Sequence, residues 1–179
     1  MTMFTQAPVI ETERVILRPH RLEDFDAYQA MWTDPKVTRF IGGRAHTREE
    51  SWVRFLRHTG TWSMLGYGYW AIEAKAGGAL VGEAGFQDMK RSIEPSIEGI
   101  PEAGWALAPA FQGIGLATEV IGRAAAWIDA NLGGRTVCII APDNAASIKV
   151  AQKCGYREVL ATSYHDKPIV LFERAVFSD

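Results

Sequence analysis

Hydrophobic positions along the chain change their spacing several times, and each spacing predicts a different element. Between residues 22 and 32 the large apolar side chains recur at helical intervals, which predicts a helix that Asp34-Pro35 ends. Residues 67–75 and 79–89 are rich in aromatic and aliphatic side chains, which predicts two strands. Gly77-Gly78 lies between them, so we expect the two strands to form a hairpin.

The remaining segments complete an order of elements that predicts the fold class. We expect further strands at 14–18, 102–107, 136–141, 156–164 and 168–177, and helices at 117–132 and 143–155. The run 136–141 is continuously apolar, which is typical of a strand buried on both faces. The order begins as an antiparallel meander and ends with a parallel crossover. We therefore predict an α/β (α+β) fold, a single mixed, mostly antiparallel central sheet of about six or seven strands flanked by helices on both faces.

One more helix is predicted by its first residues. Thr47 and Glu50 have the spacing of a capping box, in which each side chain binds the backbone N–H of the other residue. We expect the apolar face of this helix to carry Trp52, Val53 and Leu56. The segment 88–99 is polar and irregular, and we expect a surface loop there.

Composition favours a soluble globular protein with one domain, residues 1–179. Apolar residues make up 47% of the 179 positions and charged residues 22%. The formal net charge is −2, whereas general nucleic-acid binders usually carry a strong basic excess. We therefore expect no nucleic-acid partner.

Cysteine and histidine positions argue against a disulfide framework and a metal site. Cys138 and Cys154 are too few for such a framework and lack metal-ligand spacing. The histidines are scattered along the chain, at His20, His46, His58 and His165. We expect no metal, although distant residues can meet in space. Neither a signal peptide nor an apolar run of membrane-spanning length is evident, so we expect a cytoplasmic protein without a membrane partner.

The most informative stretch is 105–118, where a strand leads into a glycine-bearing turn and then directly into a helix. The first N–H groups of a helix have no internal partners, and the helix dipole makes that end electropositive. Gly113 and Gly115 allow a bulky anion to approach the backbone, so the turn is a candidate phosphate cradle. A plain strand-to-helix turn uses glycine in the same way, so spacing alone leaves both interpretations open. A P-loop and a Rossmann turn fit worse, because Leu116 and Thr118 stand where those motifs need other residues.

Several motifs together resemble the GNAT superfamily of N-acetyltransferases. The segment Gln112-x-x-Gly115-x-Ala117 resembles its Q/R-x-x-G-x-G/A signature. Other segments resemble the branch that includes ribosomal-protein N-terminal acetyltransferases. They are 13–18 (ERVILR), 102–109 (E-x-G-W-x-L-x-P), Asn144-x-x-Ser147 and 153–156 (KCGY). The likeness reaches from residue 12 to residue 156 in the family's order.

The resemblance implies acetyl-CoA as co-substrate and a place for it. In this superfamily the fourth and fifth strands, here 102–107 and 136–141, part and hold pantetheine between them. The parting is usually produced by a bulge that frees backbone groups. The resemblance implies pantetheine contacts at Leu107 and Ala108, and a backbone N–H at about Ala106 or Leu107 that binds the oxyanion. The pyrophosphate would bind the N–H groups of a continuous run of residues: Gln112, Gly113, Ile114, Gly115, Leu116, Ala117 and Thr118.

The reaction implied is direct attack of a primary amine on the thioester, which needs a base. A free amine of pKa about 8–10 is mostly protonated at pH 7, so a group must take its proton. Our candidate is Glu102, acting directly or through water. Glu83 is a rival, and either carboxylate could equally be a solvated one at a strand edge.

The departing thiolate needs a proton or a strong hydrogen bond. Many members of the superfamily use a Tyr seven residues after the Asn of the helix motif, but Ala151 stands there. Ser147 fits the hydroxyl alternative, and Asn144 with Ser147 is expected to take part in cofactor binding. Both could equally be local residues of a helix start. Cys154 lies close in sequence but has no evident His partner, so we expect it to serve in packing.

The acceptor remains open at this point. A protein N-terminus and a small amine both fit, and the segments 42–47 and 88–99 are too mixed in composition to decide. The aromatics Trp62, Tyr67, Tyr69 and Trp70 are expected to be core and sheet-face residues, with one or two of them in the acceptor pocket. The resemblance places Trp32, Phe40 and Ile41 at the acceptor-side helices, where core packing is the expected role of each. A catalytically silent acyl-CoA-binding module or sensor is the alternative function. A nucleotide-dependent oxidoreductase fits less well, because no early βαβ unit is predicted. We expect a monomer or a homodimer.

Overall fold

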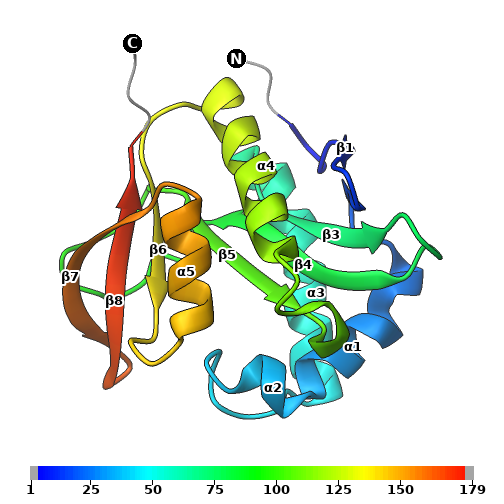
Figure 1. Cartoon of the computed structure of the whole chain (residues 1–179), viewed down its shortest axis with the longest axis horizontal. Helices are drawn as coiled ribbons and strands as arrows, with labels where there is room; N and C mark the ends of the chain where they lie inside the picture. The colour runs from blue at the N-terminus through cyan, green and yellow to red at the C-terminus, as the bar shows by residue number, and fades with distance from the viewer. Residues whose placement is uncertain (1–3, 176–179) are drawn as a thin grey trace.

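The computed structural model describes residues 4–175, and its centre is an eight-stranded sheet in the order β1-β2-β3-β4-β5-β6-β8-β7 (Figure 1). The strands are β1 (Ile10–Glu11), β2 (Val15–Arg18), β3 (Tyr69–Ala74), β4 (Leu80–Gln87), β5 (Glu102–Leu107), β6 (Thr136–Ile140), β7 (Arg157–Tyr164) and β8 (Lys167–Arg174). Only β5 and β6 are parallel neighbours; every other neighbouring pair is antiparallel. The mixed, mostly antiparallel sheet is confirmed. The additional strand is β1, whose two residues are too short for a hydrophobic alternation.

Helices cover both faces of this sheet, as predicted. They are α1 (Phe25–Thr33), α2 (Pro35–Thr38), α3 (Arg48–Leu65), α4 (Leu116–Asn131) and α5 (Ala145–Lys153), with short 3-10 turns at Leu22–Asp24 and Pro109–Phe111. In Figure 1, α4 and α5 lie in front of the sheet, and α1 and α3 lie behind it. α2 was not predicted. The Asp34-Pro35 pair that ends α1 also starts α2, because the Asp34 side chain accepts a hydrogen bond from the Lys36 N–H at 2.8 Å.

The start of α3 was predicted correctly, but its buried face only in part. Thr47 and Glu50 form the capping box, with bonds of 3.1 and 2.8 Å. Trp52 packs against the core as expected, but Val53 is 64% exposed and Leu56 is 51% exposed. The buried side chains are Ser51, Phe55, His58 and Trp62. His58 gains its partner from Tyr28 of α1, which a hydrophobic pattern along α3 cannot show.

Three tryptophans join the two sides of the sheet near one end of α3. Trp62 of α3, Trp70 of β3 and Trp127 of α4 contact one another edge to face, with ring centroids 4.8 to 5.3 Å apart. The Trp62 Nε1–H donates to the Tyr69 carbonyl at 2.9 Å. Trp62 and Trp70 are therefore core residues, as expected.

The segment 88–99 is irregular, as expected, but it is not simply a surface loop. Ile93 and Ile97 are buried, and they pack with Val137 of β6 and with Ile169 and Leu171 of β8. The two isoleucines supply the apolar cover for this face of the sheet, where no helix lies. Across the described residues, no helix has the length and apolar content that a membrane crossing requires.

Candidate active site at the parted strands β5 and β6

Strands β5 and β6 touch at one end only. Their pairing consists of one register pair, Glu102 with Val137, and the Val137 N–H donates to the Pro101 carbonyl at 3.0 Å. Beyond this point the two strands diverge (Figure 1). The pairing of β5 with β4 is regular from Glu102 to Leu107. The expected parting is therefore present, but it is not produced by a bulge of β5 against β4.

The register of β5 determines which backbone groups face the gap. The Ala108 N–H donates to the Val81 carbonyl, and the Ala108 carbonyl accepts from the Phe111 N–H, both at 2.9 Å. Since groups alternate along an antiparallel strand, Ala106 also points towards β4, whereas Trp105 and Leu107 point into the gap. The Leu107 carbonyl accepts from the Gln112 side chain at 2.8 Å, so the Leu107 N–H is the group of this residue that has no partner in the described structure. Both backbone groups of Ala108 are thus already bonded within the chain, whereas Trp105 and Leu107 present backbone groups to the gap.

The glycine-bearing turn leads into α4 with its backbone uncovered. Gly113 and Gly115 have φ angles of 77° and 80°, in the left-handed region that glycine adopts readily. Gly115 is the N-cap of α4, and no side chain caps this helix start among the described residues. The residues from Gln112 to Gly115 are exposed. The turn is therefore an open helix start that can bind an anion through N–H groups.

Arg14, which sequence reasoning missed at this site, holds the turn in place. Its guanidinium donates to the Ile114 carbonyl at 2.9 Å and to Glu119 of α4 at 2.7 Å. Its backbone N–H also donates to Glu119 at 3.1 Å. Burial opposes ionisation of Glu119, but these bonds lower the pKa of its carboxyl overall. The start of β2 is thus bonded to the start of α4.

The first turn of α5 brings Asn144 and Ser147 to the same gap. The Asn144 side chain accepts from the Ser147 N–H at 3.2 Å, so Asn144 is the N-cap of α5. Both residues line the cavity described below, and no described residue hydrogen-bonds the Ser147 hydroxyl. Ala151 is fully buried in the core. Burial raises the pKa of the Cys154 thiol, whose Sγ lies 3.6 Å from the Thr118 carbonyl, as suits a packing residue.

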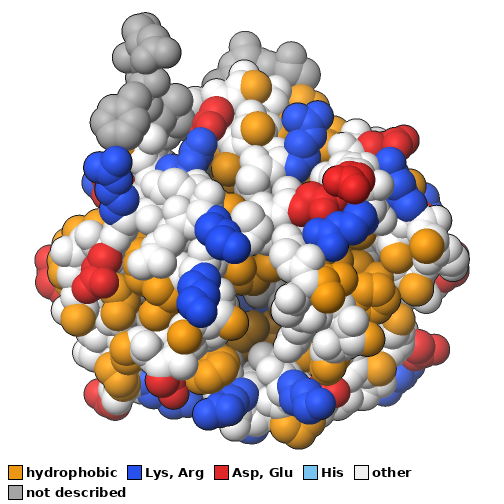
Figure 2. All heavy atoms as spheres, in the orientation of Figure 1, with side chains coloured by type: hydrophobic (Ala, Val, Ile, Leu, Met, Phe, Trp, Pro, Cys, Tyr) orange, Lys and Arg blue, Asp and Glu red, His pale blue; other side chains and the backbone are white. Residues whose placement is uncertain are grey.

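A cavity of about 500 Å³ extends from this gap between the strands and beneath the segment after α2. Figure 2 shows a hollow in the face towards the viewer, with hydrophobic side chains inside it and Lys and Arg side chains around it. Phe40 and Ile41 line the cavity, as do Trp32 of α1 and Tyr69 of β3. Four of the aromatic and apolar residues considered for the acceptor pocket are therefore at the cavity.

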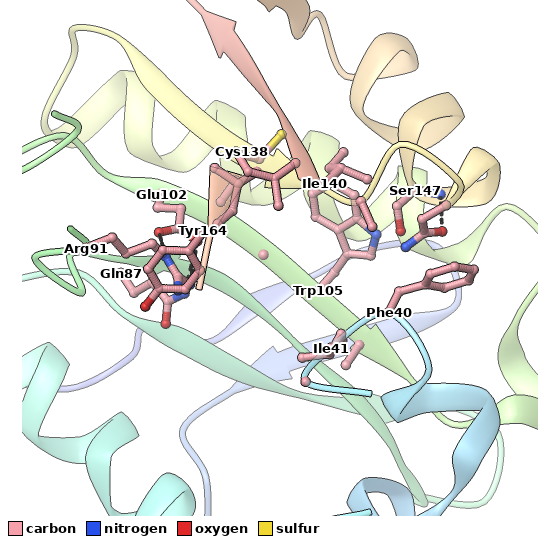
Figure 3. A pocket seen from close by; sticks show the side chains of 18 of the residues that line it. Phe40, Ile41, Gln87, Arg91, Glu102, Trp105, Cys138, Ile140, Ser147 and Tyr164 are labelled. Atoms are coloured by element: carbon pink, nitrogen blue, oxygen red, sulfur yellow. Dashed lines mark hydrogen bonds and ion pairs between the residues drawn. The ribbon is translucent and has the colours of Figure 1, made fainter. Parts of the chain in front are cut away.

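Glu102 lies on one side of this cavity and is held by an arginine. The Arg91 guanidinium donates to both Glu102 oxygens, at 2.6 and 2.9 Å, and the Gln87 amide lies 3.4 Å from one of them. Figure 3 shows Arg91, Gln87 and Tyr164 gathered around Glu102, and Ser147, Trp105 and Phe40 on the other side. Glu102 is 4% exposed, so it is not a solvated carboxylate at a strand edge. The structure brings Glu102 and Ser147 to one cavity. The Leu107 side chain is not part of the lining and is buried in the core.

Glu83, the rival carboxylate, is fully buried in a second polar cluster. Its Oε1 accepts from Arg54 Nη2 at 3.1 Å, and its Oε2 lies 2.6 Å from His58 Nε2. His20 stacks on His58, with ring centroids 4.4 Å apart. Burial lowers the pKa of His58 to about 4, outweighing the attraction of Glu83, so the imidazole is neutral at pH 7. Although burial opposes ionisation of Glu83, His58 and Arg54 hold the pKa of its carboxyl well below the usual range.

The same cluster has the composition of a metal site, which the sequence did not reveal. One ligand atom each from His20, His58 and Glu83 lie within 4.8 Å of one another. However, ligand atoms around a tetrahedral zinc are about 3.3 Å apart, given bonds of about 2.0 Å. The 2.6 Å separation of His58 Nε2 from Glu83 Oε2 is shorter than this, and the Tyr28 hydroxyl also lies 3.1 Å from His58 Nε2. Arg54 already compensates the charge of Glu83, so the cluster as it stands does not have the spacing of a zinc site.

Tyr69 and Gly104 form the floor between the two carboxylate clusters. A Cβ atom at Gly104 would lie 1.9 Å from the Tyr69 hydroxyl, so only glycine leaves room for this ring. Burial, with some contribution from Glu102, raises the pKa of the Tyr69 phenol, which stays protonated. Tyr69 is one of the four aromatic residues for which the sequence left core and pocket open, and it lines the cavity.

Sequence reasoning missed the cations of the cavity. Arg54 lies four residues before His58 on α3, so the two side chains lie on the same side of the helix. This spacing was a signal in the sequence that could have placed both residues at one site. Arg91 comes from the irregular segment before β5, where no pattern marks it. Only tertiary contacts bring these side chains to Glu83 and Glu102.

Comparisons with known proteins agree with this geometry. The family profile described as "Acetyltransferase (GNAT) domain" matches residues 14–157. The Bacillus subtilis protein YkkB is 29% identical over 177 residues, which cover 93% of this chain and 95% of YkkB. The chain therefore belongs to the GNAT family of acetyltransferases.

Solved structures show the same fold. A GnaT-family acetyltransferase structure from Bordetella pertussis superposes with a TM-score of 0.84 and 32% identity, covering 94% of this chain and all of that one. RimL, a ribosomal L7/L12 α-N-protein acetyltransferase solved in complex with coenzyme A, superposes with a TM-score of 0.74 over 96% of this chain and 100% of that one. At 17% identity the likeness to RimL concerns the fold alone.

Proposed function

We propose that this protein, as a single N-acetyltransferase domain over residues 1–179, transfers the acetyl group of acetyl-CoA to a primary amine within a ternary complex. The observation that carries the proposal is the single pairing of β5 with β6 beside an uncapped helix start. Together they leave a strip of unpaired backbone next to an anion-binding turn. The pantetheine amides need the unpaired backbone, and the diphosphate that follows them in coenzyme A needs the anion-binding turn.

Acetyl-CoA would occupy the side of the cavity formed by β5, α4 and α5, which we call the cofactor side. The diphosphate binds N–H groups between Gln112 and Thr118, and the pantetheine amides bind the Trp105 backbone and the second lone pair of the Leu107 carbonyl. The Leu107 N–H then donates to the thioester oxygen as negative charge develops on it. Support for the cofactor comes from RimL, which shares the fold and was solved with coenzyme A.

The amine would enter from the side formed by Trp32, Arg54, Tyr69 and Glu102, which we call the acceptor side. The amine nitrogen attacks the thioester carbonyl, the C–N bond forms and the C–S bond breaks. One amine proton passes to Glu102, and the thiolate leaves as coenzyme A. Both Glu102 oxygens already accept from Arg91, but each has a second lone pair, so a water relay fits this carboxylate best.

The departing thiolate would be stabilised by Ser147. Its hydroxyl lines the cavity and is not engaged by a described residue, whereas Ala151 offers no hydroxyl and is buried. A serine is a weak acid, so its role is to donate a hydrogen bond or to order a water molecule.

The two hydrogen bonds from Arg91 to Glu102 favour one alternative function. If Arg91 keeps Glu102 from accepting a proton, the protein is a catalytically silent acyl-CoA-binding module or sensor. It then binds acetyl-CoA without turnover.

The deciding experiment measures thiol release from acetyl-CoA over a panel of amines and N-terminal peptides, together with calorimetric titration of acetyl-CoA. The enzyme proposal expects both binding and amine-dependent release. Binding without release from any acceptor supports the sensor, and the absence of binding contradicts both proposals.

A further inference from the structure

The charged side chains that line the cavity are not balanced. They are Arg54, Glu83, Arg91, Glu102 and Lys167, three cations against two anions. Glu83 already accepts from Arg54, and Glu102 accepts from Arg91 through both oxygens. Each carboxylate of the lining thus has an arginine partner among the described residues, although Glu83 Oε2 itself accepts no hydrogen bond. The cation of the lining without a carboxylate partner is Lys167, so the lining carries a net positive charge that a ligand anion can compensate.

Arg54 is a cavity cation that keeps free donors beside Trp32 and Tyr69. Its Nε and Nη2 donate to the same oxygen, Glu83 Oε1, at 3.3 and 3.1 Å. A guanidinium has five N–H donors, so the Nη1 group and the second Nη2 hydrogen remain. No described residue accepts from Nη1, and the side chain is 20% exposed. The free Nη1–Nη2 edge has the geometry that binds a carboxylate through two parallel hydrogen bonds.

The position of Arg54 is fixed before any ligand binds. Its guanidinium lies 4.0 Å from the centre of the Trp32 ring, in a cation–π contact. Its partner Glu83 is fully buried, with His58 Nε2 2.6 Å from its other oxygen. Trp32 also lines the cavity, although its Nε1 atom is itself buried.

The other two cations are engaged differently. Arg91 uses its fork on both oxygens of Glu102, and its guanidinium lies 4.9 Å from the centre of the Tyr164 ring. Lys167 donates to the Gly42 carbonyl at 3.2 Å, where the segment after α2 meets β8. Arg91 keeps the same Nη1 group and second Nη2 hydrogen, and Lys167 keeps two of its three hydrogens. Arg54 differs in its closer cation–π contact, 4.0 Å from the centre of the Trp32 ring.

We propose that the acceptor is a small amine that also carries a carboxylate, such as an α-amino acid, and that Arg54 binds this carboxylate while the amine faces the thioester. The inference rests on the proposed acetyl transfer and names the acceptor class for the same site. The carboxylate takes no part in bond making; it orients the amine. A polyamine would meet Arg54 and Lys167 without a free carboxylate to compensate its own charge, so it fits poorly.

The test uses matched sets of amines that differ only in the carboxylate. Each set contains an α-amino acid, its amide and the corresponding decarboxylated amine, built on alanine, leucine and phenylalanine side chains. Thiol release gives kcat/KM for each compound at saturating acetyl-CoA. We expect at least one acid to exceed its own amide by about 30-fold or more, because the amide leaves buried donors unpaired. Equal or faster release with the amides, or with N-terminal peptides, overturns the proposal.

Two variants connect the preference to Arg54. R54Q alone leaves Glu83 as a buried charge and can fail to fold. The double variant R54Q/E83Q removes both charges, so it keeps the interior neutral. We expect the ratio of acid to amide in kcat/KM to fall to about 1 in the double variant, a loss of about 30-fold. The control R48Q removes an exposed arginine of the same helix, bonded to Asp26 and Gln29, and should keep the ratio.

Binding measurements separate a failure of this inference from a failure of the proposed function. If no amine releases thiol, the protein with coenzyme A is titrated with the N-acetyl amino acids and with their amides, followed by the indole N–H resonance that W32F removes. A shift with the acids alone supports the acceptor class even without turnover. No shift with any acid, or the same shift with the amides, overturns it. A double variant that keeps the wild-type acid preference also overturns it.

Discussion

The cofactor side and the acceptor side of the cavity differ in what they are built from. On the cofactor side the binding groups are backbone: the open turn at Gly113 and Gly115, the start of α4, and the unpaired edge of β5. On the acceptor side they are charged side chains in two clusters, Arg54 with Glu83 and Arg91 with Glu102. Backbone groups suit a ligand that does not vary, whereas side chains can be exchanged to fit a particular acceptor. The specificity of this protein is therefore expected to lie on the acceptor side.

Substitutions on the two sides are also expected to differ in their effect on folding stability. The backbone turn is exposed, so changes there affect binding more than folding. Glu83 is fully buried with its partners, and removing one member of a buried ion pair costs about 3–5 kcal/mol of stability. Variants of the acceptor side must therefore be judged by ratios and pH profiles, not by loss of activity alone.

The largest effect is expected on the cofactor side, from Gly115→Asp. A carboxylate at the start of α4 would repel the diphosphate, and a residue with a side chain is strained at a φ of 80°. We expect acetyl-CoA affinity to fall by about 100-fold or more, equivalent to about 2.7 kcal/mol, measured by calorimetry. Gly122→Asp is the charge-matched control, because it adds the same carboxylate to the exposed face of α4. An affinity of Gly115→Asp equal to that of the control would show that the turn does not hold the cofactor.

The next effect belongs to the acceptor side, in Glu102→Gln. Loss of the base should lower kcat by about 100-fold, while acetyl-CoA affinity changes little. The loss should be largest at neutral pH, where most of the amine still carries its proton, and smaller where the amine is already neutral. Steady-state kinetics between pH 7 and 10, with calorimetry for the cofactor, measure both quantities. A wild-type rate at pH 7 would remove Glu102 from the mechanism.

The buried histidine of the acceptor side gives a pH-dependent stability. Because the native pKa of His58 is lowered from 6.5 to about 4, the unfolded chain takes up a proton first as the pH falls. The stability from keeping His58 neutral is complete above pH 6.5 and is lost progressively towards pH 4. We expect the free energy of unfolding to drop by roughly 2 kcal/mol between pH 7 and pH 5 from this group.

Urea unfolding at pH 7 and pH 5 tests this expectation in the wild type and in His58→Gln. The variant cannot take up the proton, so its stability should change less between the two pH values, whatever its absolute stability. His165→Asn is the control, since it changes an exposed histidine at a positive φ that Asn tolerates. An unchanged pH dependence in His58→Gln would contradict the assignment.

The smallest effect is expected where the two sides meet, in Ser147→Ala. If the hydroxyl donates a hydrogen bond to the thiolate or orders a water, its loss should lower kcat by about 3- to 10-fold, the equivalent of one hydrogen bond. The capping bond from the Ser147 N–H to Asn144 survives, so α5 should remain intact. Single-turnover kinetics separate this step from product release. A wild-type rate would reduce Ser147 to a residue of the helix start.

Much of the fold and of the cofactor side could be predicted, because their signals are local. The glycines before Leu116, the Asn144 cap and the capping box at Thr47 each act within a few residues, and the structure has these turns and caps where the sequence placed them. The pantetheine contact at Ala108 stays a prediction, although both backbone groups of Ala108 are already bonded within the chain. In a strand, one position decides whether a group faces β4 or the gap.

The acceptor side could not be predicted in the same way, because its residues are distant in the chain. Arg54 and Glu83 are 29 positions apart, and His58 meets His20 from another element. The buried face of α3 was predicted only in part, since His58 and Arg54 gain their partners from α1 and β4.

By itself, the sequence determined the order of strands and helices, the open turn before α4 and the resemblance to acetyltransferases. These depend on backbone geometry that nearby residues set. Tertiary structure alone decided which backbone groups face the gap, which carboxylates are already paired and which cations keep free donors. Such properties depend on the burial and charge that residues acquire only when distant segments pack together.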